Sequence, residues 1–327
     1  MRPEEAAVSS ASLVPETRGL TGDDAWEVLQ RTGWGRLAKD AFKRMRVADG
    51  FSHARSLAFL MALVAIEGLI GIVGFASVLH KGRISTIIVA TVRGTVPGPA
   101  GRVLTTAVAQ AHRVVGGHHY SALLFGVLGS LVVATTAMGQ LERALNRIYG
   151  IEQDRPTLKK YGLALLFALS AGVVGAAAFI CLAFGRELFI ATDHSMGASV
   201  WSIVRWPLGV GLIAVSVTVL FRWSPRRRQP RLSWLAFGSG VSVFLWGLVT
   251  VGLGLFFASS SSFGSTYGPL AGVVALLVWS LLSSTSLLYG AALAAQLEAL
   301  RTSAPAPQDA QEVTESNPAS DAHPGEA

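Results

Sequence analysis

The stretch ALVAIEGLIGIVGFA, residues 62–76, contains one ionisable side chain, the carboxylate of Glu67, among apolar and small residues. A charged side chain at the centre of a membrane helix costs about 2.5–3.5 kcal/mol, so an ionised Glu67 that faces lipid is disfavoured. Two interpretations remain for this acid. It is a proton- or cation-responsive group in a substrate path, or it is a protonated acid that hydrogen-bonds to a neighbouring helix, for example to the hydroxyls of residues 283–286.

Other candidate chemistry is sparse. Imidazole and carboxylate groups bind zinc, and such groups gather in two connections, at His112, His118, His119, Asp193 and His194. No recognised ligand spacing accompanies them, so we predict no metal site. The sequence also lacks a G-x-x-x-x-G-K-[ST] stretch and a G-x-G-x-x-G after a strand, so we expect no cofactor and no nucleotide hydrolysis by this chain.

A nuclease needs a basic groove together with clustered acids or histidines that hold a metal ion. Glu142, Glu152 and Asp154 fall in arginine-rich connections but form no dense cluster in the sequence. A membrane-bound nuclease is therefore the least favoured interpretation. We expect a protein that is not an enzyme and has no nucleic-acid partner.

The composition indicates which elements must position these residues. Of the 327 residues 51% are hydrophobic and only 14% are charged, and the mean hydropathy is +0.48, which is typical of a membrane protein. A membrane helix needs roughly 20 mostly apolar residues. Candidate spans lie at about 56–79, 121–140, 162–184, 207–221, 235–258 and 269–295. The sequence thus predicts an all-α, polytopic membrane protein with six transmembrane helices.

The basic residues are distributed unequally between the two sides of these spans. Between residues 36 and 301, the connections and flanks expected on one side hold 17 Lys and Arg, and those on the other side hold 7. By the positive-inside rule we expect both termini to be cytoplasmic, and because no signal peptide is visible we expect the first span to direct membrane insertion. We interpret Lys159, Lys160, Arg226, Arg227 and Arg228 as membrane-surface residues that set the topology and attract anionic lipid headgroups.

The remaining organisation follows from composition. Residues 1–22 and 301–327 are predicted to be disordered tails, rich in Pro, Ser, Ala and acids. Region 23–55 has apolar residues at helical spacing and basic residues on its other faces, which predicts a cytoplasmic interfacial amphipathic helix. The membrane domain then spans 56–300. A weak sign of duplication is that the second and sixth spans run into similar stretches, QLERAL and QLEALR.

Several stretches resemble a known family. They are QLERALNRIYGIEQDRPTLKKYGLAL after the second span, FRWSPRRRQPRLSWLAFGSGVSVFLWGL across the fourth connection, and STYGPLAGVVALLVWSLLSSTSLLYGAALAAQLE in the sixth span. In order and spacing over residues 35–300 they resemble the YihY/BrkB family of bacterial inner-membrane proteins, formerly mislabelled ribonuclease BN. The positions that match its recurrent pattern are Asn146, Trp246, Tyr267 with Gly268, Trp279 and Gly290.

The resemblance implies six helices, cytoplasmic termini and no settled biochemical activity. Two departures from the family pattern stand out. Glu67 occupies a position where the family often has proline, and Ala292 and Ala294 replace an acid and an amide in the sixth span. The role of Glu67 is therefore linked to the missing acid, which it could replace.

We expect a protein that moves or exports a small solute or lipid-like molecule through the helix bundle, with membrane lipids around it. The hypothetical substrate path includes Glu67, Asn146, Tyr267 and Gly268, with Asn146 near the inner mouth and Tyr267 near the outer mouth. The alternative is a non-transporting envelope-integrity or scaffold protein. The sequence leaves the substrate, the coupling ion and the oligomeric state open.

Overall fold

The computed structural model describes residues 11–78, 96, 98–114, 119–170, 195–260 and 270–304, and within these ranges the only regular elements are helices. They are α1 (Gly22–Thr32), α2 (Trp34–Val47), α3 (Gly50–Val78), α5 (Gly98–Val114), α6 (His119–Ile148), α8 (Ser195–Trp223), α9 (Leu232–Ser259) and α11 (Ala271–Arg301), with a further helical segment at 157–170. The predicted all-α class is confirmed for this part of the chain.

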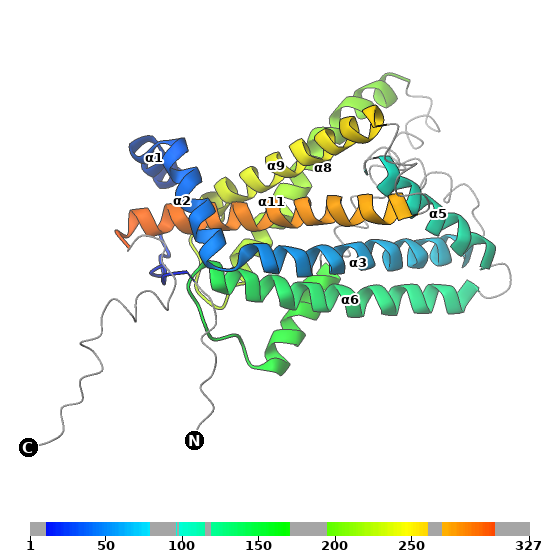
Figure 1. Cartoon of the computed structure of the whole chain (residues 1–327), viewed down its shortest axis with the longest axis horizontal. Coiled ribbons are helices and arrows are strands. Elements are labelled where there is room, and N and C mark those ends of the chain that lie inside the picture. The colour runs from blue at the N-terminus through cyan, green and yellow to red at the C-terminus, as the bar shows by residue number, and fades with distance from the viewer. Residues whose placement is uncertain are drawn as a thin grey trace, which may run out of the picture.

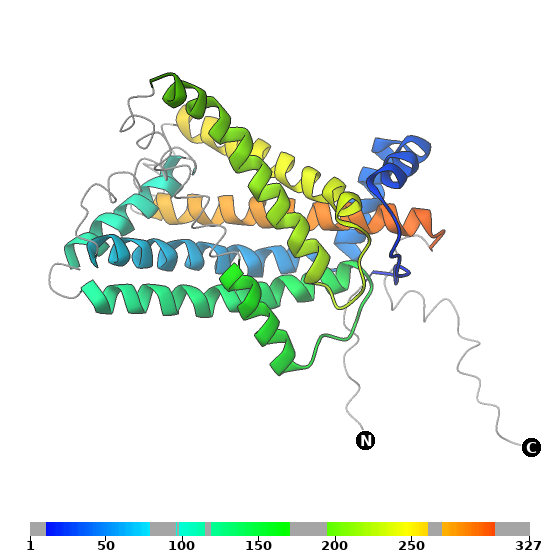
Figure 2. The same ribbon diagram turned by 180° about the vertical axis from the view of Figure 1, so that it is seen from behind.

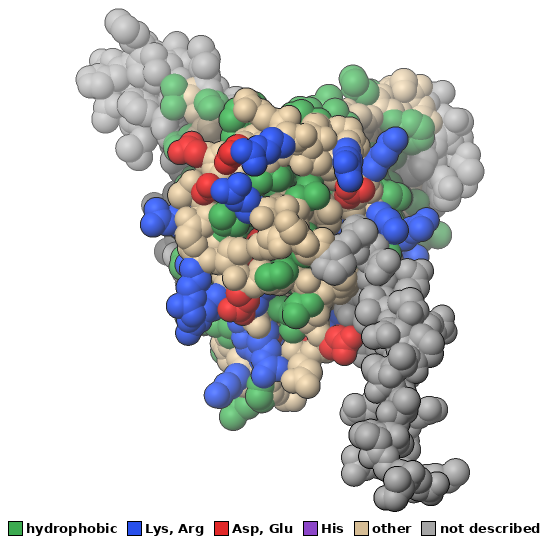
Figure 3. Space-filling view, turned by 90° about the vertical axis from the view of Figure 1, so that its left-hand side faces the viewer, with side chains coloured by type: hydrophobic (Ala, Val, Ile, Leu, Met, Phe, Trp, Pro, Cys, Tyr) green, Lys and Arg blue, Asp and Glu red, His purple; other side chains and the backbone are tan. Residues whose placement is uncertain are grey.

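The long helices form an elongated bundle. Helices α3, α6 and α11 run side by side along its length, and α9 and α8 diverge from α11 toward one end (Figures 1 and 2). Helix α5 lies across that end. Helices α1 and α2 and the C-terminus of α11 lie at the opposite end. We call it the basic end because several groups of Lys and Arg side chains are spread over its surface, with fewer Asp and Glu side chains among them (Figure 3).

Within the part of the chain that the structure describes, four helices are long and apolar enough to cross a membrane. These segments are Gly50–Gly68, Leu124–Ile148, Leu232–Ser259 and Ala271–Arg301, and they coincide with the first, second, fifth and sixth predicted spans. Pro207–Trp223 of α8, at the fourth predicted span, is apolar but shorter. The third predicted span is described only as far as residue 170. The count of six spans therefore stays a prediction.

Large apolar side chains point outward along these helices. Phe125 and Val132 of α6 are 74% and 67% exposed, and Phe244 and Leu255 of α9 are 68% and 67% exposed. Contiguous exposed apolar surface of this kind is rare on soluble monomers. In a membrane protein the same side chains contact lipid tails.

Glycines allow the closest helix contacts. A Cβ atom added to Gly71 of α3 would lie 3.2 Å from the backbone carbon of Gly126 of α6. A Cβ added to Gly238 of α9 would lie 2.5 Å from the carbonyl oxygen of Gly290 of α11. Backbones can approach this closely only without side chains between them, as is common in membrane helix packing.

The N-terminal region differs from the prediction. Residues 11–21, expected to belong to a disordered tail, lie against the basic end: Ala11 N and Val14 N donate to the carbonyls of Arg147 and Tyr149, and Val14 is 1% exposed. This stretch stays ordered because its backbone groups and Val14 find partners in the bundle. The tail residues 1–10 and 305–327 lie outside the described part of the chain.

The region 23–55, for which one interfacial helix was predicted, forms the two helices α1 and α2 and the start of α3. The predicted apolar face of α2 exists, but Leu37, Ala41 and Met45 are fully buried and α2 packs on α11. Trp34 and Phe42 of α2 are about half exposed, at 51% and 50%. Contact of α2 with the membrane interface therefore stays a prediction that depends on these two rings.

Candidate functional site

Glu67 lies in α3, half-buried, on the side that faces α6. A Cβ atom added to Gly129 of α6 would lie 2.9 Å from Glu67 Oε2, so the glycine provides the room that the carboxylate occupies. No hydrogen bond or ion pair joins Glu67 to another side chain among those that the structure describes. The acid is thus held by packing against a bare stretch of helix backbone.

The hydroxyls expected to satisfy Glu67 are used differently. Thr285 and Ser286 of α11 donate to the carbonyls of Leu281 and Leu282 in their own helix, each at 2.8 Å. Ser284 Oγ lies 3.2 Å from Met61 Sδ of α3. The proposed hydrogen bond between Glu67 and residues 283–286 does not form here, because Met61 and Glu67 are six positions apart and face different neighbours of α3.

The core of α11 also contains hydroxyls without partners. Ser280 and Ser283 are 1% and 5% exposed, and within the described residues neither Oγ has a hydrogen-bond partner. Polar atoms that are buried without a partner are uncommon and cost free energy. The bundle interior beside α3 therefore has polar character at membrane depth.

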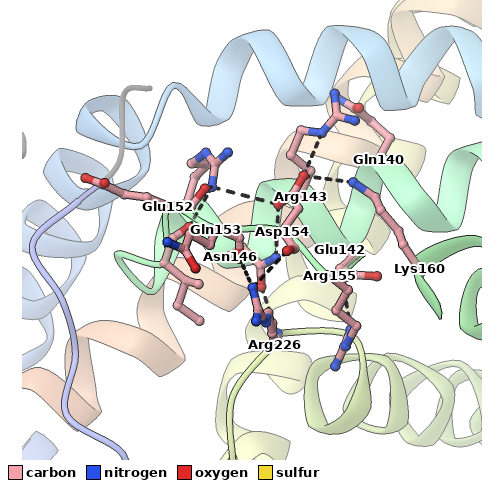
Figure 4. Close-up of polar contacts among 12 residues, drawn as sticks. Gln140, Glu142, Arg143, Asn146, Glu152, Gln153, Asp154, Arg155, Lys160 and Arg226 are labelled. Atoms are coloured by element: carbon pink, nitrogen blue, oxygen red, sulfur yellow. Dashed lines mark hydrogen bonds and ion pairs between the residues drawn. The ribbon is translucent and has the colours of Figure 1, made fainter. Parts of the chain in front are cut away.

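Asn146 lies in a polar network at the basic end (Figure 4). Its Nδ2 donates to Asp154 Oδ1 at 3.2 Å, and its Oδ1 accepts from the backbone N of Arg226 at 2.8 Å. The side chain is fully buried. One amide therefore ties the connection after α6 to the connection after α8, and a place at the mouth of a path stays a prediction for this residue.

Asp154 is the centre of this network. Lys160 Nζ lies 2.8 Å and Arg143 Nε 3.3 Å from its Oδ2 (Figure 4). Burial by itself raises the pKa of Asp154, but the hydrogen bonds from Lys160 and Asn146 and the positive charges nearby outweigh it and hold the pKa below the ordinary value of 3.8. Asp154 is therefore ionised at neutral pH and is fully engaged in binding basic residues.

A second pair links the same connections. Glu142 of α6 forms an ion pair with Arg155 at 3.0 Å, and Arg155 also donates to the carbonyls of Ser224 and Pro225 at 2.6 and 2.8 Å. Arg155 thus fixes the start of the 224–231 connection, in addition to the contact of Asn146 with Arg226.

A buried ion pair lies deeper at the basic end. Arg227 Nη2 is 2.7 Å from Glu298 Oε1 of α11, and the two side chains are 2% and 0% exposed. Thr17 covers the pair, because its backbone N and its Oγ1 both donate to Glu298 Oε1. The guanidinium carbon of Arg227 is 4.6 Å from the ring centre of Tyr149, a cation–π distance.

Arg44 of α2 is buried beside this pair. Its Nε donates to Gln296 Oε1 at 2.8 Å, and its Nη1 donates to the carbonyls of Ser12 and Ile148. Burial, together with a smaller effect of the positive charge of Arg227, lowers the pKa of Arg44 to about 10, and Tyr149 opposes this shift only in part. Arg44 therefore stays protonated at neutral pH and joins α2, α6, α11 and the N-terminal stretch.

Apolar grooves run along α9. One of about 820 Å³ lies between α8 and α9, with Val210, Ala214, Trp246 and Leu248 in its walls. Another of about 610 Å³ lies among α2, α9 and α11 and includes Trp34. Such volumes match those of small-molecule sites, and their apolar walls suit a hydrocarbon chain.

The predicted site residues therefore do not all meet. Glu67 lies along the bundle and Asn146 at the basic end, while Tyr267 and Gly268 fall outside the described residues. The histidines considered for zinc belong to segments or side chains that are also outside the described part. No group of three His, Cys, Asp or Glu side chains that could hold a metal ion occurs within the described residues.

The basic residues interpreted as topology signals divide into two groups. Lys159, Arg226 and Arg228 are exposed, whereas Lys160 and Arg227 form the partly and fully buried ion pairs described above. Sequence reasoning missed the roles of Glu298, Gln296 and Thr17. The sequence signal that could have found them is the repeated QLE stretch, in which both copies use the glutamine and the glutamate in the same way. In the first copy Gln140 contacts His53 and Glu142 binds Arg155. In the second copy Gln296 contacts Arg44 and Glu298 binds Arg227.

This fold defines an all-helical membrane protein with several apolar helices of membrane-spanning length. The family described as virulence factor BrkB matches residues 41–314, and the chain belongs to this family. The expected resemblance is confirmed.

Curated relatives agree with this assignment. The ribonuclease-like protein YfkH of Bacillus subtilis is 22% identical over 257 residues, which cover 77% of this chain and 91% of that protein. UPF0761 membrane proteins of Alteromonas mediterranea and Teredinibacter turnerae are 25% and 29% identical over 51% of this chain, and the matches cover 56% and 38% of those proteins. The BrkB and UPF0761 descriptions name no catalytic activity. No solved structure matches the chain.

Proposed function

We propose that this protein moves a small solute or lipid-like molecule across the inner membrane through its helix bundle, without nucleotide hydrolysis of its own. The observation that carries the proposal is the position of Glu67. This carboxylate lies within the apolar helix α3 against Gly129, and no cation or hydroxyl of the described residues binds it. Ionisable residues at membrane depth are costly and are typical of substrate or ion pathways.

The energy source in this proposal is an ion gradient. A carboxylate that is not held by a counter-charge can bind a proton or a sodium ion and release it when its surroundings change. The buried, unpartnered hydroxyls of Ser280 and Ser283 on α11 offer further polar groups inside the bundle. Glu67 thereby supplies an acid inside the bundle, although at a different level from Ala292, where the sixth span lacks one. Met61 of α3 lies beside Ser284 of α11, and from there Glu67 and Ala292 lie in opposite directions along the antiparallel helices.

Lipid-like substrates fit the apolar grooves along α9 best. The groove between α8 and α9 is large enough for part of an acyl chain, and its walls are almost entirely apolar. Asn146, Tyr267 and Gly268 remain proposed path residues at the two mouths.

The proposed orientation places the basic end in the cytoplasm. Arg301 at the C-terminus of α11 lies 3.6 Å from Asp24 of α1, so both ends of the helical region lie on one side of the bundle. An even number of crossings is required by that arrangement. Basic residues favour the cytoplasmic side, which supports cytoplasmic termini.

The test is a flux assay in proteoliposomes with imposed proton or sodium gradients. Wild-type protein is compared with Glu67→Gln at matched reconstitution, over panels of small solutes and fluorescent lipids. We expect gradient-driven flux that is lost in Glu67→Gln. A variant that removes an exposed charge elsewhere, Lys39→Gln on α2, is the matched control and should keep the wild-type flux.

The second candidate is a scaffold that holds lipids or partner proteins without transport. The buried network of Arg44, Arg227 and Glu298 favours it, since it joins helices and connections into a rigid end. The ion pairs around Asp154 argue against a nuclease, because Glu142 and Asp154 are engaged with Arg155 and Lys160. Absence of flux from folded protein across the panels supports the scaffold.

A further inference from the structure

A basic pocket lies at the end of α8, separate from Glu67 and from the apolar grooves. Its volume is about 400 Å³. The walls come from three segments: the N-terminal stretch, the last turn of α8 and the connection after it. The residues are Arg18, Arg222, Trp223, Arg227, Arg228 and Gln229.

The pocket has an excess of positive charge. Arg222 donates to the backbone carbonyls of Gln229 and Pro230, which are neutral acceptors, so its charge is not balanced by these bonds. Arg227 binds Glu298 through Nη2, but its buried Nη1 has no partner in the described part of the chain. The other nearby acid is Glu16, which accepts from the backbone N of Arg228. Four guanidinium groups thus face at most two carboxylates.

The walls are fixed before any ligand binds. Arg155 holds the carbonyls of Ser224 and Pro225, and Asn146 holds the backbone N of Arg226. Arg227 also donates to the carbonyl of Pro15, which ties the N-terminal stretch to the connection. A preorganised site loses less entropy on binding than a flexible one.

The depth of the pocket indicates the ligand. It adjoins the end of the apolar helix Pro207–Trp223, and Trp223 is 50% exposed there. Tryptophan and arginine at the end of an apolar helix are typical of the headgroup layer. Arginine forks bind phosphate oxygens in pairs, and basic pockets beside membrane helices suit anionic lipid headgroups.

We propose that this pocket binds a phosphate group, for which the headgroup of an anionic phospholipid is one source and a free phosphate is the other. Exposed Arg18 and Arg228 are the rim contacts, and Arg227 and Arg222 form the base. The site goes beyond the proposed transport function, because a protein that moves nothing can still bind a lipid here.

The experiment titrates purified full-length protein by calorimetry in an uncharged maltoside detergent, which carries no phosphate that could compete for the site. The three ligands are dihexanoyl phosphatidylglycerol, dihexanoyl phosphatidylcholine and inorganic phosphate. The variant Arg18→Ala/Arg228→Ala removes two exposed charges and leaves the buried ion pair intact. Lys39→Ala/Lys43→Ala on the exposed face of α2 removes the same charge elsewhere.

We expect phosphatidylglycerol to bind about tenfold more weakly to the pocket variant, since two partly exposed charge contacts contribute about 1.4 kcal/mol together. The α2 variant should bind as wild type does, and phosphatidylcholine should bind weakly throughout. If inorganic phosphate binds and shows the same loss in the pocket variant, free phosphate is sufficient and the site is supported. Binding that is equal for both lipids, or that falls equally in both variants, overturns the proposal, as does the absence of binding.

Discussion

The buried pair of Arg227 and Glu298 provides the sharpest test of how the basic end is held together. Both side chains are almost completely buried, at 2% and 0% exposure. Removing one partner leaves the other charge buried and unpaired, which costs about 3–5 kcal/mol. For a chain of this length we expect the unfolding midpoint to fall by about 6–10 °C in Arg227→Met or Glu298→Gln, at roughly 2 °C per kcal/mol.

The assay is fluorescence-detected thermal unfolding in detergent, with Arg36→Met as the control. Arg36 lies 3.9 Å from Asp40, and its side chain is 76% exposed, so the same substitution should cost about 0–1 kcal/mol there. The double variant Arg227→Met/Glu298→Gln should be less destabilised than the sum of the single variants, because no unpaired charge is left. A midpoint for Arg227→Met that equals that of Arg36→Met refutes this reasoning.

Three further predictions concern smaller contacts. Thr17→Val removes the hydroxyl that donates to Glu298 and should cost about 1–2 kcal/mol in the same unfolding assay, whereas an unchanged midpoint contradicts the covering role. Gly129→Val places a side chain where the Glu67 carboxylate lies, so it should lower the free energy of unfolding by about 1–3 kcal/mol and reduce any flux. Because the pKa of Asp154 is lower when folded than its ordinary 3.8, its stabilisation is complete above about pH 4 and is lost as the pH falls through the folded pKa. The stability difference between wild type and Asp154→Asn should therefore shrink in unfolding scans below about pH 4, and a difference that stays constant down to pH 2 contradicts it.

Hydropathy predicts the long apolar helices well because the signal is local. Length and apolar content placed the first, second, fifth and sixth spans on α3, α6, α9 and α11. The spacing of Leu37, Ala41 and Met45 also predicted an apolar helix face, but not that α11 covers it. A surface lipid and a second helix satisfy the same pattern, so the sequence cannot distinguish them.

The basic end was harder to predict because its contacts are distant in sequence. Thr17 and Glu298 are 281 positions apart, and Arg44 and Gln296 are 252 apart. An arginine with several basic neighbours on the same helix is expected on a solvent-exposed face. Arg44 is buried instead, and two backbone carbonyls and Gln296 replace the water at its Nε and Nη1, while Nη2 has no partner among the described residues.

The sequence predicts that Glu67 lies within the helix bundle but not which residues surround it. An acid in an apolar run indicates a site at membrane depth, and that inference needs no structure. Two features cannot be read from the sequence: the contact of Glu67 with Gly129, and the hydrogen bonds of the α11 hydroxyls within their own helix. Both depend on the orientation of α3 about its axis between α6 and α11. That orientation is set by close glycine contacts such as Gly71 with Gly126, which hydropathy does not encode.

The most direct test of the transport proposal is gradient-driven flux in proteoliposomes that contain wild-type protein or Glu67→Gln. Both proteins are first matched for unfolding midpoint and reconstituted amount, so a loss of flux reflects the carboxylate and not the fold. We predict flux of a solute or lipid under a proton or sodium gradient for wild type, and none for Glu67→Gln. Equal flux in both proteins, or none from folded wild type across the panels, contradicts a coupling role for Glu67.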